Sequence, residues 1–159
     1  MTSLAKIFST GVVCSVTGWL PADLRALRNR NGLFPETRQG GVGYTWTKYS
    51  FVDLCVADVV ARMMRLGFSG SEAVSIASAL DDIFYYLCKD SETTDRWAMV
   101  RRGIAQIAGG IAIKRLGSSF SSSDLTMDNG DPGAGVLIDC LEIVAHVRAV
   151  VDAARESAR

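Results

Sequence analysis

The first half of the chain contains several residues that begin or end helices, and their positions restrict the fold more than any other feature. Pro21 suits the first position of a helix, because its missing N–H would have no intrahelical partner there. Asn31-Gly32 closes the same segment, because both residues tolerate the left-handed backbone that often ends helices. The sequence therefore predicts a helix over residues 21–31, preceded by a tight turn and a short helix over residues 7–17.

Serine residues placed three positions before a carboxylate predict two more helices. Ser50 and Ser69 each begin such a capping box, in which the serine hydroxyl and the carboxylate accept hydrogen bonds from each other's backbone N–H groups. Behind each box, apolar residues recur at helical spacing. We therefore expect helices over residues 50–66 and 69–88.

The segment between these helix pairs, residues 33–49, has a different pattern. Three glycines within RQGGVGY supply a flexible turn, and the following YTWTKY alternates in the manner of a strand. Arg38 and Lys48 flank this turn. The segment predicts a β-hairpin, or wing, with basic and aromatic residues near its tip.

A polar run at residues 89–95, KDSETTD, predicts a boundary within the chain. It separates an N-terminal domain, residues 1–88, from a C-terminal unit, residues 96–159. The expected fold class is mainly α with small β elements. It combines a winged helix-turn-helix at the N-terminus with a small α+β dimerisation unit at the C-terminus.

Within the C-terminal unit, residues 96–108 fit either a helix or a strand. Strands are expected over residues 111–116 and 135–138, and a final helix begins at Asp139. One face of this helix carries an apolar stripe, which we interpret as the surface through which two copies associate. The stripe consists of Ile143, Val147, Val150 and Ala154.

The charge distribution favours a specific partner over a general nucleic-acid coat, because the formal net charge is zero. Residues 1–67 carry eight Lys/Arg and four Asp/Glu, a net of +4, whereas residues 68–159 carry nine and thirteen, a net of −4. A basic N-terminal part and an acidic C-terminal part fit a DNA-contacting module joined to a partner module, although a charge difference of this size also arises by chance.

The reactive residues form no catalytic or metal-binding pattern. The four cysteines are widely spaced, which predicts buried free thiols in a reducing cytoplasm. His146 is the only histidine and accompanies no nucleophile in a recognisable arrangement, so we expect no enzyme activity, no cofactor and no metal.

The apolar run near the N-terminus is too short and too interrupted for a signal peptide or a membrane span. We expect a cytoplasmic protein without a membrane partner.

Six short motifs keep a fixed order and spacing along the first half of the chain. They are Thr17-Gly18, PADLR at 21–25, NGLFP at 31–35, WTKYS at 46–50, Asp53-Leu54, and LGFS at 66–69 followed by Glu72. Together they resemble the DNA-binding domain of the MerR family over about residues 7–88. The resemblance implies a winged helix-turn-helix in which the helix over residues 21–31 recognises DNA.

A short helix presented by a tight turn fits the major groove, and its first exposed residues reach base edges. Here these are Ala22, Asp23 and Arg25, while Arg28 would neutralise a phosphate or donate to guanine. An ion pair of either arginine within the protein is the alternative. The residues expected to grip DNA from the wing are Arg38, Tyr44 and Lys48.

These observations predict a bacterial or phage transcriptional regulator that binds an inverted repeat in double-stranded DNA as a homodimer, with RNA polymerase as a further candidate partner. Two alternatives stay open. The first is an excisionase-like architectural factor that bends DNA with the same module. The second is an adaptor that binds a protein partner and has lost its DNA contacts.

Overall fold

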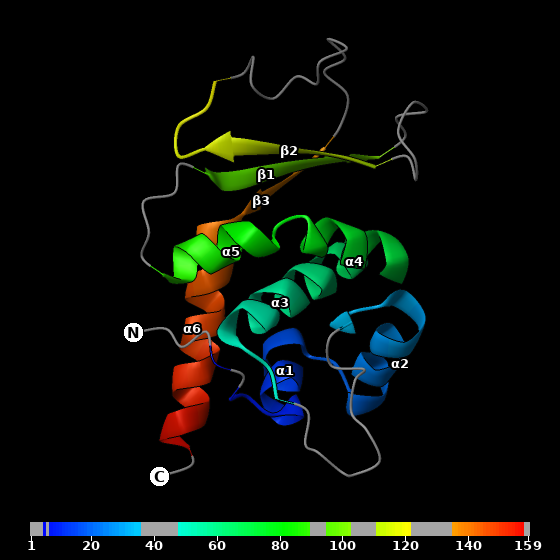
Figure 1. Ribbon diagram of the computed structural model, residues 1–159, viewed down its shortest axis with the longest axis vertical. Coiled ribbons are helices and arrows are strands. Elements are labelled where there is room, and N and C mark those ends of the chain that lie inside the picture. Colours follow the sequence, from blue (N-terminus) through cyan, green and yellow to red (C-terminus); the bar gives the residue numbers. More distant parts are fainter. Residues whose placement is uncertain are drawn as a thin grey trace.

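A computed structural model shows six helices and a small sheet among the residues it describes, in agreement with the expected mainly α fold with small β elements. Figure 1 shows the sheet as a layer over α4 and α5, with α6 along one side of the helices. The structure describes residues 5, 7–35, 48–89, 95–102, 111–121 and 135–157. The elements are α1 (Thr10–Thr17), α2 (Pro21–Asn31), α3 (Phe51–Arg65), α4 (Gly70–Ser78), α5 (Asp81–Cys88), β1 (Asp95–Arg102), β2 (Ile111–Gly117), β3 (Val136–Asp139) and α6 (Cys140–Glu156).

The first two helices are joined by a three-residue turn and end where the sequence predicted. Gly18 ends α1 with a φ of 74°, and its N–H donates to the carbonyl of Cys14 at 2.8 Å. Gly32 ends α2 with the same φ of 74°. Because a side chain at a positive φ is strained, both positions favour glycine. The helix predicted over residues 21–31 is confirmed, and α1 begins three residues later than predicted.

The two predicted capping boxes are both present. The N–H of Asp53 donates to the hydroxyl of Ser50 at 3.1 Å, and the N–H of Ser50 donates to the carboxylate of Asp53 at 2.7 Å. Ser69 and Glu72 make the same two bonds, at 3.3 and 2.7 Å. These bonds satisfy N–H groups that the first turn of a helix leaves without partners, so they fix where α3 and α4 begin.

The single helix predicted over residues 69–88 is wrong, because the chain breaks it into α4 and α5. A guanidinium from β2 occupies the break. Arg115 donates to the backbone carbonyl of Ala79 at 2.8 Å and to the carboxylate of Asp82 at 2.6 and 2.8 Å. A partner more than thirty residues away thus satisfies a carbonyl that a continuous helix would have bonded internally.

The sheet is antiparallel with the strand order β2-β1-β3, so β1 is central. The strands predicted near residues 111 and 135 are confirmed, and the segment that fitted either a helix or a strand is strand β1. Ala98 and Val100 of β1 are fully buried and belong to the same core as the helices. Alternate residues of this layer therefore anchor it to the helical layer beneath.

One hydrophobic core spans the predicted domain boundary. Buried residues of α1, α3, α5, β1 and α6 form a single cluster, and α6 packs against α1, α3 and α5. The stripe predicted for dimerisation lies largely inside this core: Ile143 and Val147 are almost completely buried, and Val150 packs against them. A second copy cannot reach Ile143 or Val147 without unpacking α6, so these two side chains stabilise the chain's own fold. Ala154 is half-buried.

The C-terminal end of the predicted wing segment pairs with the residues just before α1. Tyr49 forms an isolated antiparallel bridge with Phe8, its N–H donating to the Phe8 carbonyl at 2.9 Å. Residues 36–47, which include the predicted hairpin tip, lie outside the described residues. Across the part of the chain that the structure describes, no helix combines the length and the apolar character needed to span a membrane.

Candidate nucleic-acid interface

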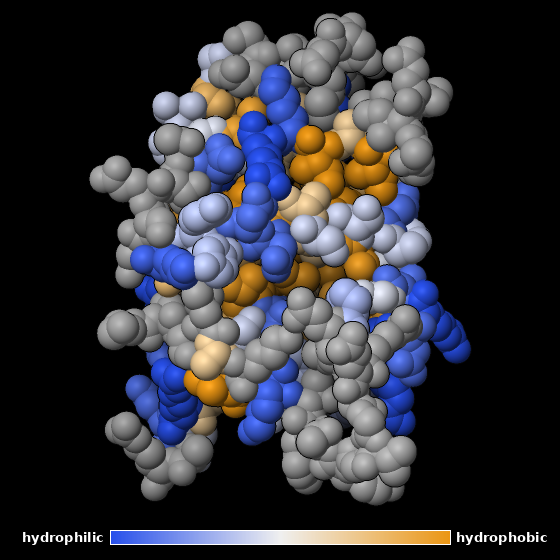
Figure 2. Space-filling view, viewed as in Figure 1, coloured by the Kyte–Doolittle hydropathy of each residue, from blue (hydrophilic) through white to orange (hydrophobic). Residues whose placement is uncertain are grey.

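The surface of α2 has one apolar side and one hydrophilic side. Leu24 and Leu27 are buried in the core, whereas Ala22, Asp23 and Arg25 are exposed. The edge of the molecule where α2 lies in Figure 1 is predominantly hydrophilic in Figure 2. The predicted recognition residues at the start of α2 therefore share a solvent-facing surface on a helix that the core holds in place.

The carboxylate of Asp23 already has a structural partner. It accepts a hydrogen bond from the N–H of Leu20 at 3.0 Å and so caps the first turn of α2. Leu20 has no side-chain acceptor, so Asp23 supplies only one half of a capping box, the bond to the N–H of the N-cap residue. This role fixes the carboxylate beside the turn, and it competes with the predicted contact between Asp23 and a base.

Arg28 points partly into the protein. One of its terminal nitrogens, Nη1, donates to the hydroxyl of Tyr49 at 3.4 Å. The ring of Tyr49 is fully buried and packs edge-on against Phe34, with 5.2 Å between the ring centroids. Tyr49 is thus a core residue. Arg28 therefore links α2 to this core, in addition to any contact that it makes with DNA.

The turn before α2 is braced by Arg65, a residue that the sequence analysis did not select. Nη2 of Arg65, at the end of α3, donates to the backbone carbonyl of Thr17 at 2.8 Å. Within the turn, the hydroxyl of Thr17 donates to the carbonyl of Val13 and accepts from the N–H of Trp19. A cation near the last carbonyls of a helix is favourable. The position of Arg65 in the last turn of α3 does not indicate that its side chain reaches α1.

The predicted wing contacts are only partly within the described residues. Lys48 is exposed and directly precedes the bridge between Tyr49 and Phe8. Arg38 and Tyr44 lie outside the described residues. The structure therefore places one of the three predicted wing residues, on the segment that leads from the wing into α3.

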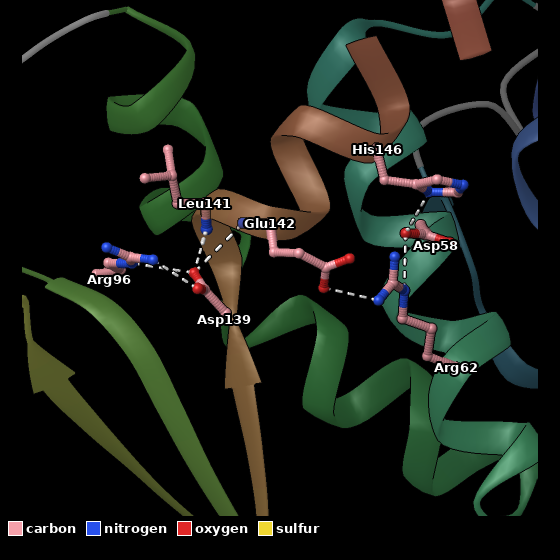
Figure 3. Close-up of polar contacts among 7 residues, drawn as sticks. All are labelled: Asp58, Arg62, Arg96, Asp139, Leu141, Glu142 and His146. Carbon is pink, nitrogen blue, oxygen red and sulfur yellow. Dashed lines mark hydrogen bonds and ion pairs between the residues drawn. The ribbon is translucent and has the colours of Figure 1, made fainter. Parts of the chain in front are cut away.

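A second polar cluster lies between α3 and α6 (Figure 3). The carboxylate of Asp58 is only 1% exposed, and its Oδ2 is 3.0 Å from Nε of Arg62 and 3.1 Å from Nδ1 of His146. Nη1 of Arg62 also donates to Glu142 at 2.8 Å. Burial alone would lower the pKa of the Arg62 guanidinium, but Asp58 and Glu142 raise it above its usual value. This cluster joins α3 to α6, and it gives the single histidine a structural role.

A third cluster joins the sheet to the start of α6. Asp139 caps α6 by accepting hydrogen bonds from the N–H groups of Leu141 and Glu142 at 3.0 and 3.3 Å, as the sequence predicted. Arg96 of β1 binds the same carboxylate through two nitrogens, at 3.1 and 2.7 Å. The hydrogen bonds from Arg96 hold the pKa of the Asp139 carboxyl below its usual value, against the opposing effect of burial.

A shallow groove of about 170 Å³ separates these two clusters. Its walls come from the C-terminal half of α3, the strand β3 and the first turn of α6. Most of its lining is apolar, and Arg62, Asp139 and Glu142 supply the polar groups. The groove is therefore a surface where sheet and helices meet.

Three of the four cysteines are buried, as predicted, but they are neighbours in space. Burial raises the pKa of the Cys55 thiol well above its usual range, and a hydrogen bond with the Cys88 thiol adds to this shift. Burial raises the pKa of the Cys140 thiol to about 12. Cys14 is only half-buried. All four are free thiols, and the three buried ones behave as core residues.

Among the described residues, no group of three or more His, Cys, Asp or Glu side chains is arranged to hold a metal ion. Comparison with known proteins found no matching family model and no related protein among those with curated descriptions.

Proposed function

We propose that the chain is a sequence-specific DNA-binding transcriptional regulator in which α2 enters the major groove. The observation that carries this proposal is the pairing of α1 and α2 by a braced three-residue turn, which leaves a hydrophilic face of α2 open to solvent. An α-helix fits the major groove, and the residues of its first turns reach base edges. The MerR-like motifs over about residues 7–88 support the same orientation.

In this proposal residues of α2, together with Lys48, divide into two roles. Arg25 is exposed and follows the capped first turn, so it is the candidate for reading a guanine edge. Ala22 allows the helix to approach the groove closely because its side chain is small. Arg28 and Lys48 contact phosphates and position the helix. Two copies would place two α2 helices on adjacent half-sites of an inverted repeat.

The first experiment is selection from a random duplex library with the purified chain at physiological salt, followed by footprinting of the best sequence. A protected inverted repeat supports the dimeric regulator. Broad, salt-sensitive retention without a motif would instead favour the architectural factor that bends DNA.

Arg25→Ala is the mutation that tests the reading role. It should weaken binding to the selected site by about 1–3 kcal/mol and relax the preference at one base position. The matched control is Arg148→Ala, because Arg148 is exposed on α6, away from α2 (Figure 1). Unchanged affinity of the purified Arg25 variant for the selected site would reject this role.

Lys48→Ala tests the positioning role. Loss of one phosphate contact should weaken all sequences by a similar factor and reduce the slope of log affinity against log salt by about one. A loss confined to the selected sequence would contradict a phosphate contact.

A second candidate function is an adaptor that binds a protein through the same surface. The observation that favours it is Leu20, which is 67% exposed in the turn immediately before α2. A large apolar side chain at the tip of a binding surface suits a protein partner, because burying it away from water makes the free energy of binding more favourable. Leu20→Ser separates the two functions, because it should impair protein binding and leave DNA binding nearly unchanged.

A further inference from the structure

The guanidinium of Arg65 lies beside the turn that leads into α2. Its Nη2 donates to the carbonyl of Thr17, the last residue of α1, at 2.8 Å. Only residues 18–20 separate Thr17 from the first residue of α2, Pro21. Three residues of fully extended chain span at most about 11 Å, so the guanidinium stays close to the start of α2.

Arg65 carries a positive charge that no described carboxylate neutralises. Its side chain is exposed, and within the described ranges the Thr17 carbonyl is the one acceptor that it binds. A guanidinium has five N–H donors, so this bond leaves most of them for another acceptor. Other arginines of the described part differ, because each pairs with a carboxylate: Arg62, Arg96, Arg115 and Arg155. Arg65 is therefore a cation with donors left for an anion.

The packing of the helices fixes this cation relative to α2. α1 packs against α3, and α2 packs against α4. At the second contact, a Cβ at Gly70 would lie 3.0 Å from Oδ1 of Asn31 and 3.2 Å from Cδ2 of Leu27, so the two helices are in close contact there. Only residues 66–69 separate Arg65, at the end of α3, from Gly70, at the start of α4. The corner between α3 and α4 thus holds both α1 and α2.

The ligand that fits this arrangement is a phosphate of duplex DNA. In the proposed function, on which this site depends, the first turns of α2 enter the major groove. The groove is about 12 Å wide, and a helix with its side chains is about 10–12 Å across, so the phosphates of both strands border a helix inside it. A cation beside the turn before that helix lies next to those phosphates. Arginine suits them, because two N–H groups of its planar guanidinium can donate to two phosphate oxygens at once.

We propose that Arg65 binds a backbone phosphate at the edge of the DNA site while Nη2 keeps its bond to the Thr17 carbonyl. One side of the guanidinium then holds the turn and the other side binds DNA, so the contact sets how α2 enters the groove. A side chain that is already held in place loses less conformational entropy on binding. The site is separate from Lys48, on the wing segment, and from Arg28, which is bonded to Tyr49.

The first test measures the affinity of the purified chain for the selected duplex over a range of salt concentrations. Arg65→Ala should weaken binding to all sequences by about tenfold at physiological salt. It should also lower the slope of log affinity against log salt by about one for each bound chain, because fewer counterions are released. Arg65→Lys keeps the charge and should recover most of the slope. Arg148→Ala is the control, because Arg148 is exposed on α6, and it should change neither quantity.

Thr17→Val separates the phosphate contact from a purely structural role of Arg65. Valine resembles threonine in shape but lacks the hydroxyl that binds the carbonyl of Val13 and the N–H of Trp19, so the turn loses two bonds while Arg65 keeps its charge. This variant should lose affinity and keep the native salt slope. An unchanged slope in Arg65→Ala would overturn the phosphate contact, and so would an equal fall in Thr17→Val.

Duplexes that carry a single methylphosphonate, which is uncharged, locate the phosphate. With the native chain, replacement of the phosphate bound by Arg65 should cost about the same tenfold factor. With Arg65→Ala the same replacement should cost almost nothing, whereas with Lys48→Ala it should keep its full cost. If every position cost the native chain and Arg65→Ala the same, no phosphate would depend on Arg65 and the site would be rejected.

The outcomes also separate this site from the proposed function. A chain whose base preference depends on Arg25, but whose salt slope ignores Arg65→Ala, keeps the function and rejects the site. A native chain that retains no duplex DNA at low salt rejects both. Circular dichroism spectra and urea unfolding show whether Arg65→Ala keeps the native fold, and Arg65→Lys supplies the same comparison with the charge in place.

Discussion

Asp139 should be one of the residues on which the stability of the fold depends most clearly, because one carboxylate caps α6 and also binds Arg96 of β1. Asp139→Ala removes both sets of bonds. Loss of a helix N-cap costs about 0.5–2 kcal/mol, and the ordered position of this carboxylate places the expected cost at about 1–2 kcal/mol. For a chain of this length, that corresponds to a fall in Tm of about 2–8 °C.

Asp139→Asn separates the two contributions. Asparagine caps helices about as well as aspartate, so this variant keeps the cap and loses the charge that Arg96 binds. It should therefore be less destabilised than Asp139→Ala. Asp152→Ala is a control on the same helix, because Asp152 is an exposed residue whose ion pair with Arg155 is long, at 3.7 Å.

The pH dependence provides a second readout of the same carboxylate. Because the folded pKa of Asp139 is lowered, its ionised form stabilises the folded state above the unfolded pKa of about 3.9, and this contribution disappears as pH falls through the folded value. The difference between the native chain and Asp139→Asn should be full at pH 6 and shrink below about pH 4.

The assay is urea unfolding followed by circular dichroism at a series of pH values. The reasoning is refuted if the asparagine variant loses as much stability as the alanine variant, since the cap would then contribute nothing. A difference between the native chain and Asp139→Asn that persists at the lowest pH would equally refute the role of the charge.

Two other substitutions should have defined effects on stability in the same urea assay. Asp58→Ala should cost about 1–3 kcal/mol, because it removes a buried acceptor that Arg62 and His146 share; a loss well below about 1 kcal/mol would show that water replaces the carboxylate fully. Gly32→Ala should cost about 1–2 kcal/mol from the positive φ alone, since no atom lies within 4 Å of the added methyl group. Gly32→Asn should cost less, because asparagine tolerates this conformation, and equal losses in the two variants would point to another cause.

The ends of the helices could be predicted from the sequence because local bonds determine them. Pro21 and Gly32 bound α2 within their own segment, and Ser50 and Ser69 find their capping partners three residues away. Such bonds close within one turn of chain, so the residue types and their spacing are sufficient to indicate them. Asp139 as the cap of α6 belongs to the same class.

The candidate site was predictable only in part. The exposure of Arg25 follows from helical periodicity, because Leu24 and Leu27 define the buried side of α2. The bond between Arg28 and Tyr49 joins residues 21 positions apart, and that between Arg65 and Thr17 joins residues 48 apart. No periodic pattern specifies contacts over such separations.

The sequence by itself determined where most helices begin and end and which side of each is apolar. The tertiary structure decided what those apolar sides pack against. The stripe holding Ile143 and Val147 is equally compatible with a dimer and with a core, and only the position of α6 against α1, α3 and α5 makes it core. Likewise, Arg115 from β2 binds the Ala79 carbonyl at the break between α4 and α5, a contact that no local pattern specifies. The physical reason is that the spacing of apolar residues shows which face of a helix is buried. The element that this face packs against depends on how segments distant in the sequence meet.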